Sequence, residues 1–136
     1  MTGGLNRATI QVATRAPNEI LDITPQVERA IGELGIRDGF VLLYCPHTTA
    51  ALTVNESADP SVRDDVNRAL AAMVPDIPFR HAEGNSPSHL RSALMGPSLV
   101  LPVRGGRLEL GTWQGVYFCE FDGPRSRSVW VYQLGS

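Results

Sequence analysis

The three histidines of the chain, His47, His81 and His89, are the residues best suited to metal or acid–base chemistry. Each is expected at a loop or at the end of an element, beside other polar residues, and none lies in an apolar helical stripe. A single histidine in such a place is usually a hydrogen-bonded surface group. Three histidines, with a carboxylate or an open water position, form a metal site. We therefore expect the three rings to converge on one divalent ion, zinc or magnesium, although the spacing of His81 and His89 is not that of a zinc finger.

His89 is expected in the first turn of a helix that Ser86 and Pro87 open. The positive end of a helix dipole favours the neutral imidazole, which is the form that binds metals. The free backbone N–H groups of the same turn can hold a phosphate group. The sequence thus predicts that this helix start holds a metal ion and an anion side by side.

Glu120 is a further candidate because it is a carboxylate in a strand with two apolar faces. A buried carboxylate needs a partner, and Arg125 or Arg127 could supply one in a purely structural pair. The alternative is a carboxylate that faces the site, as the hydrogen-bond partner of a histidine or as a proton acceptor. We predict this second role.

Trp113 and Gln114 lie at a bend between strands, flanked by Gly111 and Gly115. Packing accounts well for a lone tryptophan, but less well for the amide beside it. We predict that Gln114 lies at the cleft and that Trp113 helps to wall it.

Short elements, separated by glycine and proline, must position these residues. Apolar runs and alternation predict strands over 7–14, 20–23, 39–45, 49–55, 98–103, 107–110, 115–122 and 126–134. Helical spacing predicts helices over 24–34, 60–74 and 86–94, the first two capped by Thr24 and Asp59. The strands do not alternate regularly with helices, so we expect an α+β fold, mostly antiparallel, and not a doubly wound parallel sheet.

Length and composition predict a single domain over residues 1–136. Apolar residues make up 43% of the chain and charged residues 19%, and the net charge is −2. This is the balance of a folded globular protein and not of a nucleic-acid-binding one. No apolar run approaches the roughly 20 residues of a membrane span. Residues 1–7 lack the pattern of a signal peptide, and we expect a cytoplasmic protein.

All 12 basic residues are arginine. The lack of lysine excludes Schiff-base catalysis and a P-loop, so an anionic group would be held by arginine, backbone amides or a metal ion. Cys45 and Cys119 lie far apart in apolar runs. They predict two buried free thiols in a reducing compartment, and there is no Cys-x-x-Cys motif.

Several stretches closely resemble the signature sequences of the YjbQ family, also called UPF0047. They are 46–56, followed by Asp59, Pro60 and Asp65; 88–90 with 92–94; 106–117, which contains Gly-Thr-Trp-Gln-Gly; and 119–125. The similarity follows the chain in order over nearly its whole length. On these motifs the chain is identified as a member of this family.

The resemblance implies a compact α+β fold around an antiparallel β-sandwich, and a homotrimer with clefts near the subunit interfaces. It implies a weak, secondary thiamine-phosphate synthase activity, in which a hydroxymethylpyrimidine diphosphate joins a thiazole phosphate and pyrophosphate is released. It also implies that His47, His81 and His89 are the metal ligands. Many family members carry a longer acidic insert between the last two, and only Glu83 stands there in this chain.

The residue chemistry and the matched motifs together give the candidate site. Its expected catalytic residues are Glu120, Gln114, Asn55 and Glu56, and its expected substrate- or phosphate-binding residues are Thr48, Asn85, Ser88, Trp113 and Arg125. The leading hypothesis is a metal-assisted transferase acting on a phosphorylated small molecule. Two alternatives stay open: a metal-dependent hydrolase of such a molecule, and a non-catalytic protein that binds a metal ion or an anionic metabolite.

Overall fold

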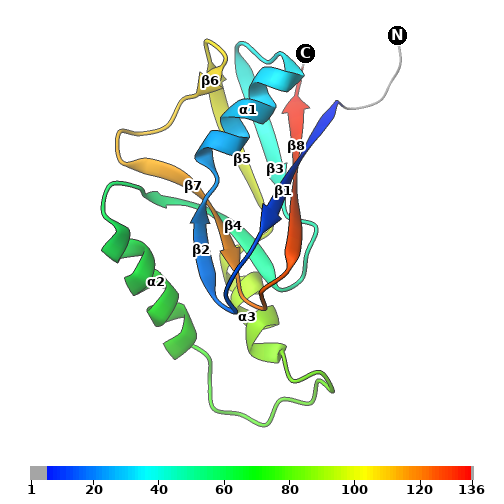
Figure 1. The fold of residues 1–136 in the computed structure, drawn as a ribbon, viewed down its shortest axis with the longest axis vertical. Helices are drawn as coiled ribbons and strands as arrows, with labels where there is room; N and C mark the ends of the chain where they lie inside the picture. The colour runs from blue at the N-terminus through cyan, green and yellow to red at the C-terminus, as the bar shows by residue number, and fades with distance from the viewer. Residues whose placement is uncertain (1–5, 136) are drawn as a thin grey trace.

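The computed structural model describes residues 6–135 and confirms an antiparallel α+β fold (Figure 1). Residues 1–5 and 136, which the predicted domain includes, lie outside the described residues. In order, the elements are β1 (Arg7–Ala13), β2 (Glu19–Asp22), α1 (Thr24–Leu34), β3 (Gly39–Tyr44), β4 (Ala50–Glu56), α2 (Pro60–Ala72), α3 (Ser86–Met95), β5 (Ser98–Arg104), β6 (Arg107–Leu108), β7 (Gln114–Glu120) and β8 (Ser126–Leu134). None of the described helices is long and apolar enough to cross a membrane.

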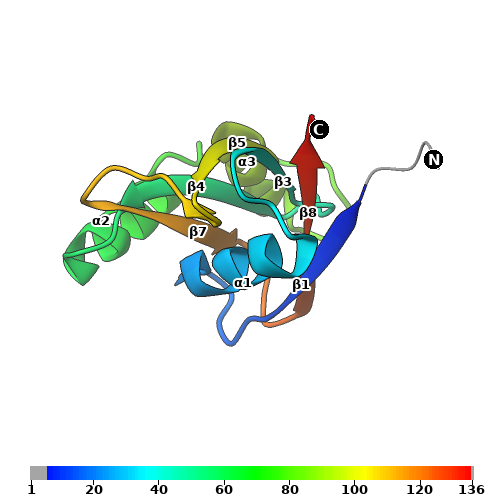
Figure 2. The same ribbon diagram turned by 90° about the horizontal axis from the view of Figure 1, so that it is seen from above.

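The strands form two sheets that curl around one core. The larger sheet has the order β1-β8-β3-β5-β6 and the smaller one the order β2-β7-β4, and every neighbouring pair is antiparallel. Figure 2 shows α1 between β7 and β1, where it closes the open side between the sheets. The predicted β-sandwich thus has the form of a half-barrel with a helix along its opening.

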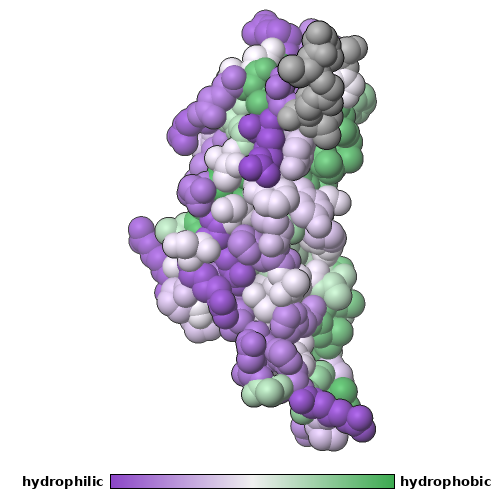
Figure 3. All heavy atoms as spheres, turned by 90° about the vertical axis from the view of Figure 1, so that its right-hand side faces the viewer, coloured by the Kyte–Doolittle hydropathy of each residue, from purple (hydrophilic) through white to green (hydrophobic). Residues whose placement is uncertain are grey.

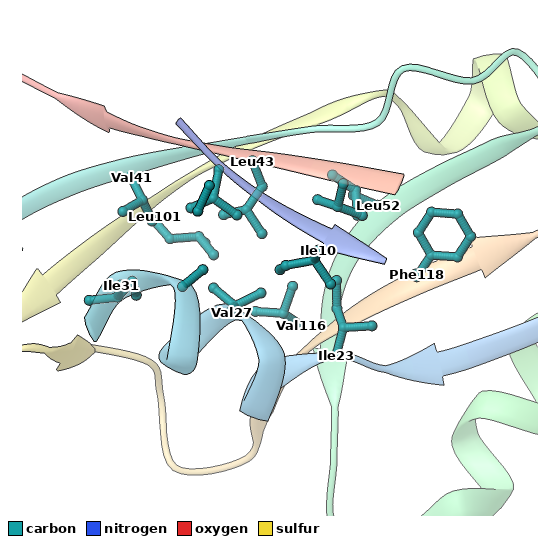
Figure 4. Close-up of a cluster of buried hydrophobic side chains, with 14 of the residues drawn as sticks. Ile10, Ile23, Val27, Ile31, Val41, Leu43, Leu52, Leu101, Val116 and Phe118 are labelled. Carbon is teal, nitrogen blue, oxygen red and sulfur yellow. The ribbon is translucent and has the colours of Figure 1, made fainter. Parts of the chain in front are cut away.

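The core is made by the residues that alternation and helical spacing turn inward. Figure 4 shows them meeting from both sheets and from α1; they include Ile10, Ile23, Val27, Ile31, Val41, Leu43, Leu52, Leu101, Val116 and Phe118. β1 alternates strictly between exposed and buried residues, as predicted. Burial of this apolar surface is the main force that holds the two sheets together.

A second, smaller apolar cluster lies on the other face of the three-stranded sheet. Ala51, Leu70, Cys119 and Phe121 form it, with Met95 of α3 packed against them. Both cysteines are buried free thiols, as predicted. These contacts hold α3 in place, and with it the first turn of α3, which contains His89.

The helix starts differ from the prediction in one respect. Asp59 caps α2, because its side chain accepts a hydrogen bond from the backbone N–H of Ser61 at 2.9 Å. Thr24 does not cap α1; Ile23 holds that position, and the Thr24 hydroxyl accepts a hydrogen bond from the N–H of Val116 instead. A link from α1 to β7 therefore replaces the local cap.

Candidate functional site

All three histidines line one open cavity of about 400 Å³, here called the histidine cavity. Its wall contains Pro46, His47, Thr48, Thr49, His81, Glu83, Asn85, His89, Asp122, Arg125 and Arg127. They come from the connection between β3 and β4, the loop before α3, the first turn of α3, the connection between β7 and β8, and the start of β8. The cavity is large enough for a small metabolite. A pocket of about 10 Å³ beside Tyr117, by contrast, holds no more than a water molecule.

His47 is held in one orientation by the backbone of β8. Its Nε2 atom accepts a hydrogen bond from the N–H of Ser128 at 2.9 Å. Burial, and after it the charge of Arg127, lowers the pKa of His47 below its usual value. His47 is therefore a neutral imidazole at pH 7, with its proton on Nδ1.

His81 and His89 lie next to each other. Their ring centroids are 5.4 Å apart in an edge-to-face arrangement. His81 comes from the exposed loop before α3, and His89 is in the first turn of that helix, as predicted. The Asn85 residue that precedes α3 makes no side-chain capping bond to the helix.

Glu120 and Arg127 form a buried ion pair behind the cavity wall. The side chains of Glu120 and Arg127 are 0% and 5% exposed. Nε of Arg127 donates to Oε1 of Glu120 at 2.8 Å, and Nη2 donates to Oε2. Thr14 donates its hydroxyl to Oε1 at 2.7 Å, and the N–H of Asp122 donates to Oε2 at 3.0 Å.

These hydrogen bonds decide the charge of Glu120. Burial by itself raises the pKa of a carboxyl group, but the bonds from Arg127, Thr14 and Asp122 outweigh it and hold the pKa of Glu120 below its usual value. Glu120 is therefore ionised, and it contacts two residues of the cavity wall, Arg127 and Asp122. Of the two arrangements considered for Glu120, the structure contains the ion pair with Arg127; a role in proton transfer stays a prediction.

Arg125 and Asp122 form a second pair on the wall. Nη2 of Arg125 donates to Oδ2 of Asp122 at 2.8 Å, and Nδ2 of Asn85 donates to the same oxygen at 3.0 Å. The bond from Asn85 lowers the pKa of Asp122 most, burial opposes it, and Arg125 adds to the lowering. Oδ1 of Asn85 is buried and has no hydrogen-bond partner among the described residues.

Of the predicted binding residues, Thr48, Asn85 and Arg125 line the cavity and Ser88 does not. Ser88 is buried, and its hydroxyl donates to the carbonyl oxygen of Phe121 at 2.5 Å. Its hydroxyl therefore secures α3 to the residue that follows β7, and its contact with a phosphate stays a prediction.

Four other predicted residues lie at the opposite end of β4 and β7. Glu56 pairs with Gln114 in the register of these strands, Asn55 pairs with Gly115, and Trp113 precedes Gln114. Gln114 is six residues before Glu120 along β7, which separates them by about 20 Å. The side chain of Gln114 accepts a hydrogen bond from the N–H of Gly111 at 2.8 Å, and Trp113 is 64% exposed. The amide closes a turn and lies outside the histidine cavity of its own chain. The predicted place of Gln114 and Trp113 at a cleft stays a prediction.

Sequence reasoning missed Arg127, Thr49 and Asp122 as cavity residues. Arg127 had a detectable signal, because it shares the inward phase of β8 with Val129 and Val131. A charged residue in the buried phase of a strand marks either a buried pair or a site. Here Arg127 belongs to both.

The histidine set does not fit a shared metal ion as the side chains lie here. Within residues 6–135, no group of three or more histidine, cysteine, aspartate or glutamate side chains is placed to hold one. His47 would have to bind the ion through Nδ1, which moves its proton to Nε2. That proton would face the N–H of Ser128, which already donates there. The divalent ion therefore stays a prediction.

Comparison with known proteins identifies the family to which this chain is related. The family model described as UPF0047 protein YjbQ-like matches residues 8–136. UPF0047 protein YugU of Bacillus subtilis is 47% identical over 129 residues, which cover 93% of this chain and 98% of YugU. UPF0047 protein MJ1081 of Methanocaldococcus jannaschii is 45% identical over 126 residues, with 92% and 91% covered.

Solved structures show the same fold. A crystal structure of a yjbq/upf0047 family protein from Clostridium acetobutylicum matches with a TM-score of 0.88 and 43% identity, and covers 93% of this chain and 99% of that one. A hypothetical protein from Aeropyrum pernix matches with a TM-score of 0.89 and 39% identity, covering 96% and 99%.

Proposed function

Because the chain belongs to the UPF0047 family of YjbQ-like proteins, we propose that the histidine cavity binds the phosphate or diphosphate group of a small metabolite and supports a transferase reaction. The reaction proposed is of the thiamine-phosphate synthase type, as a secondary activity. The methylene carbon of a hydroxymethylpyrimidine diphosphate forms a C–N bond with the thiazole nitrogen, the C–O bond breaks, and pyrophosphate leaves with the electron pair.

One observation carries the proposal: three histidines and two arginines share a single open cavity of metabolite size. Loss of pyrophosphate requires donors or positive charge at the departing oxygens. Arginine N–H groups and neutral imidazole N–H groups supply such donors. This gives a chain without lysine a way to hold a diphosphate.

The charges of the wall favour a cation that arrives with the substrate. Arg125 and Arg127 are each paired with a carboxylate, Asp122 and Glu120, and Glu83 lines the cavity as well. The described side chains therefore leave most of the negative charge of a diphosphate uncompensated. Magnesium commonly binds through substrate phosphates and only one or two protein carboxylates, and Glu83 and Asp122 are the carboxylates on the wall. Zinc remains the second candidate ion.

A homotrimer is proposed for the same protein. The outer face of the larger sheet carries exposed apolar side chains over β3 and β5: Phe40, Tyr44 and Val100 are 53%, 39% and 58% exposed. Figure 3 shows hydrophobic residues gathered along the right-hand edge of the molecule. An apolar sheet face of this kind is often covered by another subunit. Light scattering at micromolar concentration should give three times the chain mass of 14.8 kDa, and a monomer mass would refute the trimer.

The experiment for the activity is a turnover assay with both thiamine precursors, with and without magnesium or zinc. We expect pyrophosphate release that requires both precursors and falls when His81 and His89 are replaced together by alanine. Phosphate release from one precursor alone would establish the hydrolase instead. Tight binding without turnover would establish a binding protein. A double variant that keeps full activity and full metal content would refute the assignment of the reaction to this cavity.

A further inference from the structure

Resting on the proposed phosphate-binding role of the histidine cavity, we propose that His47 and Arg127 form a fixed oxyanion-binding pair in which His47 donates from Nδ1 and Arg127 donates from Nη1. In this arrangement His47 is a hydrogen-bond donor to the substrate and does not bind a metal ion. The pair takes a phosphate oxygen or two oxygens of one phosphate group.

The hydrogen bond from Ser128 sets the role of His47. A backbone N–H can only donate, so Nε2 of His47 must present a lone pair to it at 2.9 Å. The neutral ring then carries its proton on Nδ1. Nδ1 makes no hydrogen bond to another described residue and is not among the buried unpaired atoms. His47 lines the cavity, so this N–H is available to a ligand there.

Arg127 has one nitrogen left by the same reasoning. Nε is used by Glu120, and Nη2 is used by Glu120 and by the hydroxyl and carbonyl oxygens of Thr49. Nη1 makes no hydrogen bond within the described part of the chain and is not a buried unpaired atom. Because Glu120 accepts hydrogen bonds from two nitrogens of the planar guanidinium group, the direction of Nη1 is fixed.

Two neighbouring cross-links place both donors on one wall. His47 accepts a hydrogen bond from Ser128, and Thr49 accepts one from Arg127 at 2.8 Å. Two hydrogen bonds therefore connect residues 47–49 to residues 127–128. The donors therefore keep their relative positions without a ligand. Donors that need no reorganisation are those that bind a developing anion best.

Because of Glu120, we expect the pair to bind a ligand through hydrogen bonds more than through long-range electrostatic attraction. Glu120 neutralises Arg127 from behind, so the ligand gains a charge-assisted hydrogen bond and little long-range attraction. The pair should thus bind pyrophosphate with a weaker dependence on salt than an unpaired arginine would give.

The first test reads the proton position on His47. In ¹⁵N-labelled protein at pH 7.5, long-range ¹H–¹⁵N correlation distinguishes the two neutral tautomers of histidine, and the spectrum of a His47→Asn variant assigns the His47 signals by their loss. We expect the Nδ1–H tautomer. A proton on Nε2, or a His47 nitrogen shifted by added zinc, would overturn the inference.

The second test measures pyrophosphate binding by calorimetry for three variants. Asparagine places an amide N–H close to the position of Nδ1, so His47→Asn should bind within about 3-fold of the wild type, while His47→Ala should bind about 3- to 10-fold more weakly. The double variant Glu120→Leu, Arg127→Met removes the donor without leaving an unpaired charge. It should lose about 10- to 100-fold in affinity.

Arg68→Met is the matched control, because Arg68 is a surface arginine of α2 that pairs with Asp64 and Asp65, outside the cavity. Circular dichroism and thermal unfolding verify that each variant is folded. An affinity for pyrophosphate equal to that of the wild type in both His47→Ala and the double variant would overturn the inference. A wild type that binds no pyrophosphate would also overturn it.

Turnover in the same samples separates this inference from the proposed function. Binding that depends on His47 and Arg127, without thiamine phosphate formation, would leave the pair in place and refute the transferase. Thiamine phosphate formation with unchanged pyrophosphate affinity in the variants would refute the pair alone.

Discussion

Replacing Glu120 by glutamine tests the ion pair on which the cavity wall rests. The change keeps the size and shape of the side chain and removes its charge. Oε1 of Glu120 accepts hydrogen bonds from Thr14 and Arg127, and Oε2 accepts them from Arg127 and Asp122. An amide NH₂ at the Oε2 position faces the N–H donors of Arg127 and Asp122, and both bonds are lost. At the Oε1 position it faces Nε of Arg127 and the hydroxyl of Thr14, which can turn to the carbonyl oxygen of Arg125, so the bond from Arg127 is lost. In both orientations one arginine is left buried without its counter-charge.

The expected loss of stability is large for a single atom change. Breaking a buried, hydrogen-bonded ion pair from one side costs about 3–5 kcal/mol. In a chain of 136 residues, each kcal/mol lowers the melting temperature by about 4 °C. Glu120→Gln should therefore melt about 12–20 °C below the wild type.

Urea and thermal unfolding followed by circular dichroism measure the change, with the urea m-value expected to stay constant. Asp64→Asn is the matched control: Asp64 pairs with Arg68 on the surface, where the two side chains are 68% and 70% exposed, and its loss should cost less than about 1 kcal/mol. The double variant Glu120→Leu, Arg127→Met should recover most of the stability, because it removes both charges. A Glu120→Gln protein within about 1 kcal/mol of the wild type would refute the buried ion pair.

Three further predictions concern the same region. The pKa of Glu120 is lower in the folded chain than its usual value of 4.5, so its stabilising contribution is complete above that pH and is lost as the pH falls through the folded-state value; urea unfolding between pH 5 and about pH 2 should show a steeper decline for the wild type than for Glu120→Gln. A Cβ atom on Gly123 would lie 2.4 Å from the carbonyl oxygen of Ala16 and 2.8 Å from Cγ of Glu120, so Gly123→Ala should destabilise by about 1–3 kcal/mol or more, whereas Gly32→Ala in α1, with open space at that atom, should stabilise by about 0.5–1 kcal/mol. Thr14→Val should cost about 1–3 kcal/mol, and in a double-mutant cycle with Glu120→Gln the two losses should not add, since Thr14 and Glu120 share one hydrogen bond.

Local patterns predicted most of the fold. Alternation in β1 and apolar spacing in α1 both depend on residues close in sequence, and the structure contains both. The N-cap at Thr24 failed because the hydroxyl found a distant partner, Val116, that no local rule includes. Pairings across the sheets are decided by packing and not by local propensity.

In the candidate site, too, the sequence predicts the local features and not the contacts between residues distant in the chain. The three histidines were found from residue type and setting, and the structure brings them to one cavity. The sequence does not distinguish Arg125 from Arg127 as the partner of Glu120, because both are close to it in the chain. The inward phase of β8 selects Arg127, and the turn after β7 directs Arg125 to Asp122. The turn at Gln114 is a local contact between residues three positions apart, which the sequence could have revealed.

Stability alone does not explain why the chain buries Glu120 and Arg127. Two apolar side chains of similar volume would keep most of that stability, since removing two charges from water costs about as much as their attraction returns. Apolar side chains cannot, however, hold an N–H group in a fixed direction on a cavity wall. Thr14 donates to Glu120 and Thr49 accepts from Arg127, which leaves Nη1 of Arg127 as the one nitrogen of that guanidinium without a partner in residues 6–135. The pair therefore has its explanation in the cavity beside His47, where a ligand oxygen can complete it.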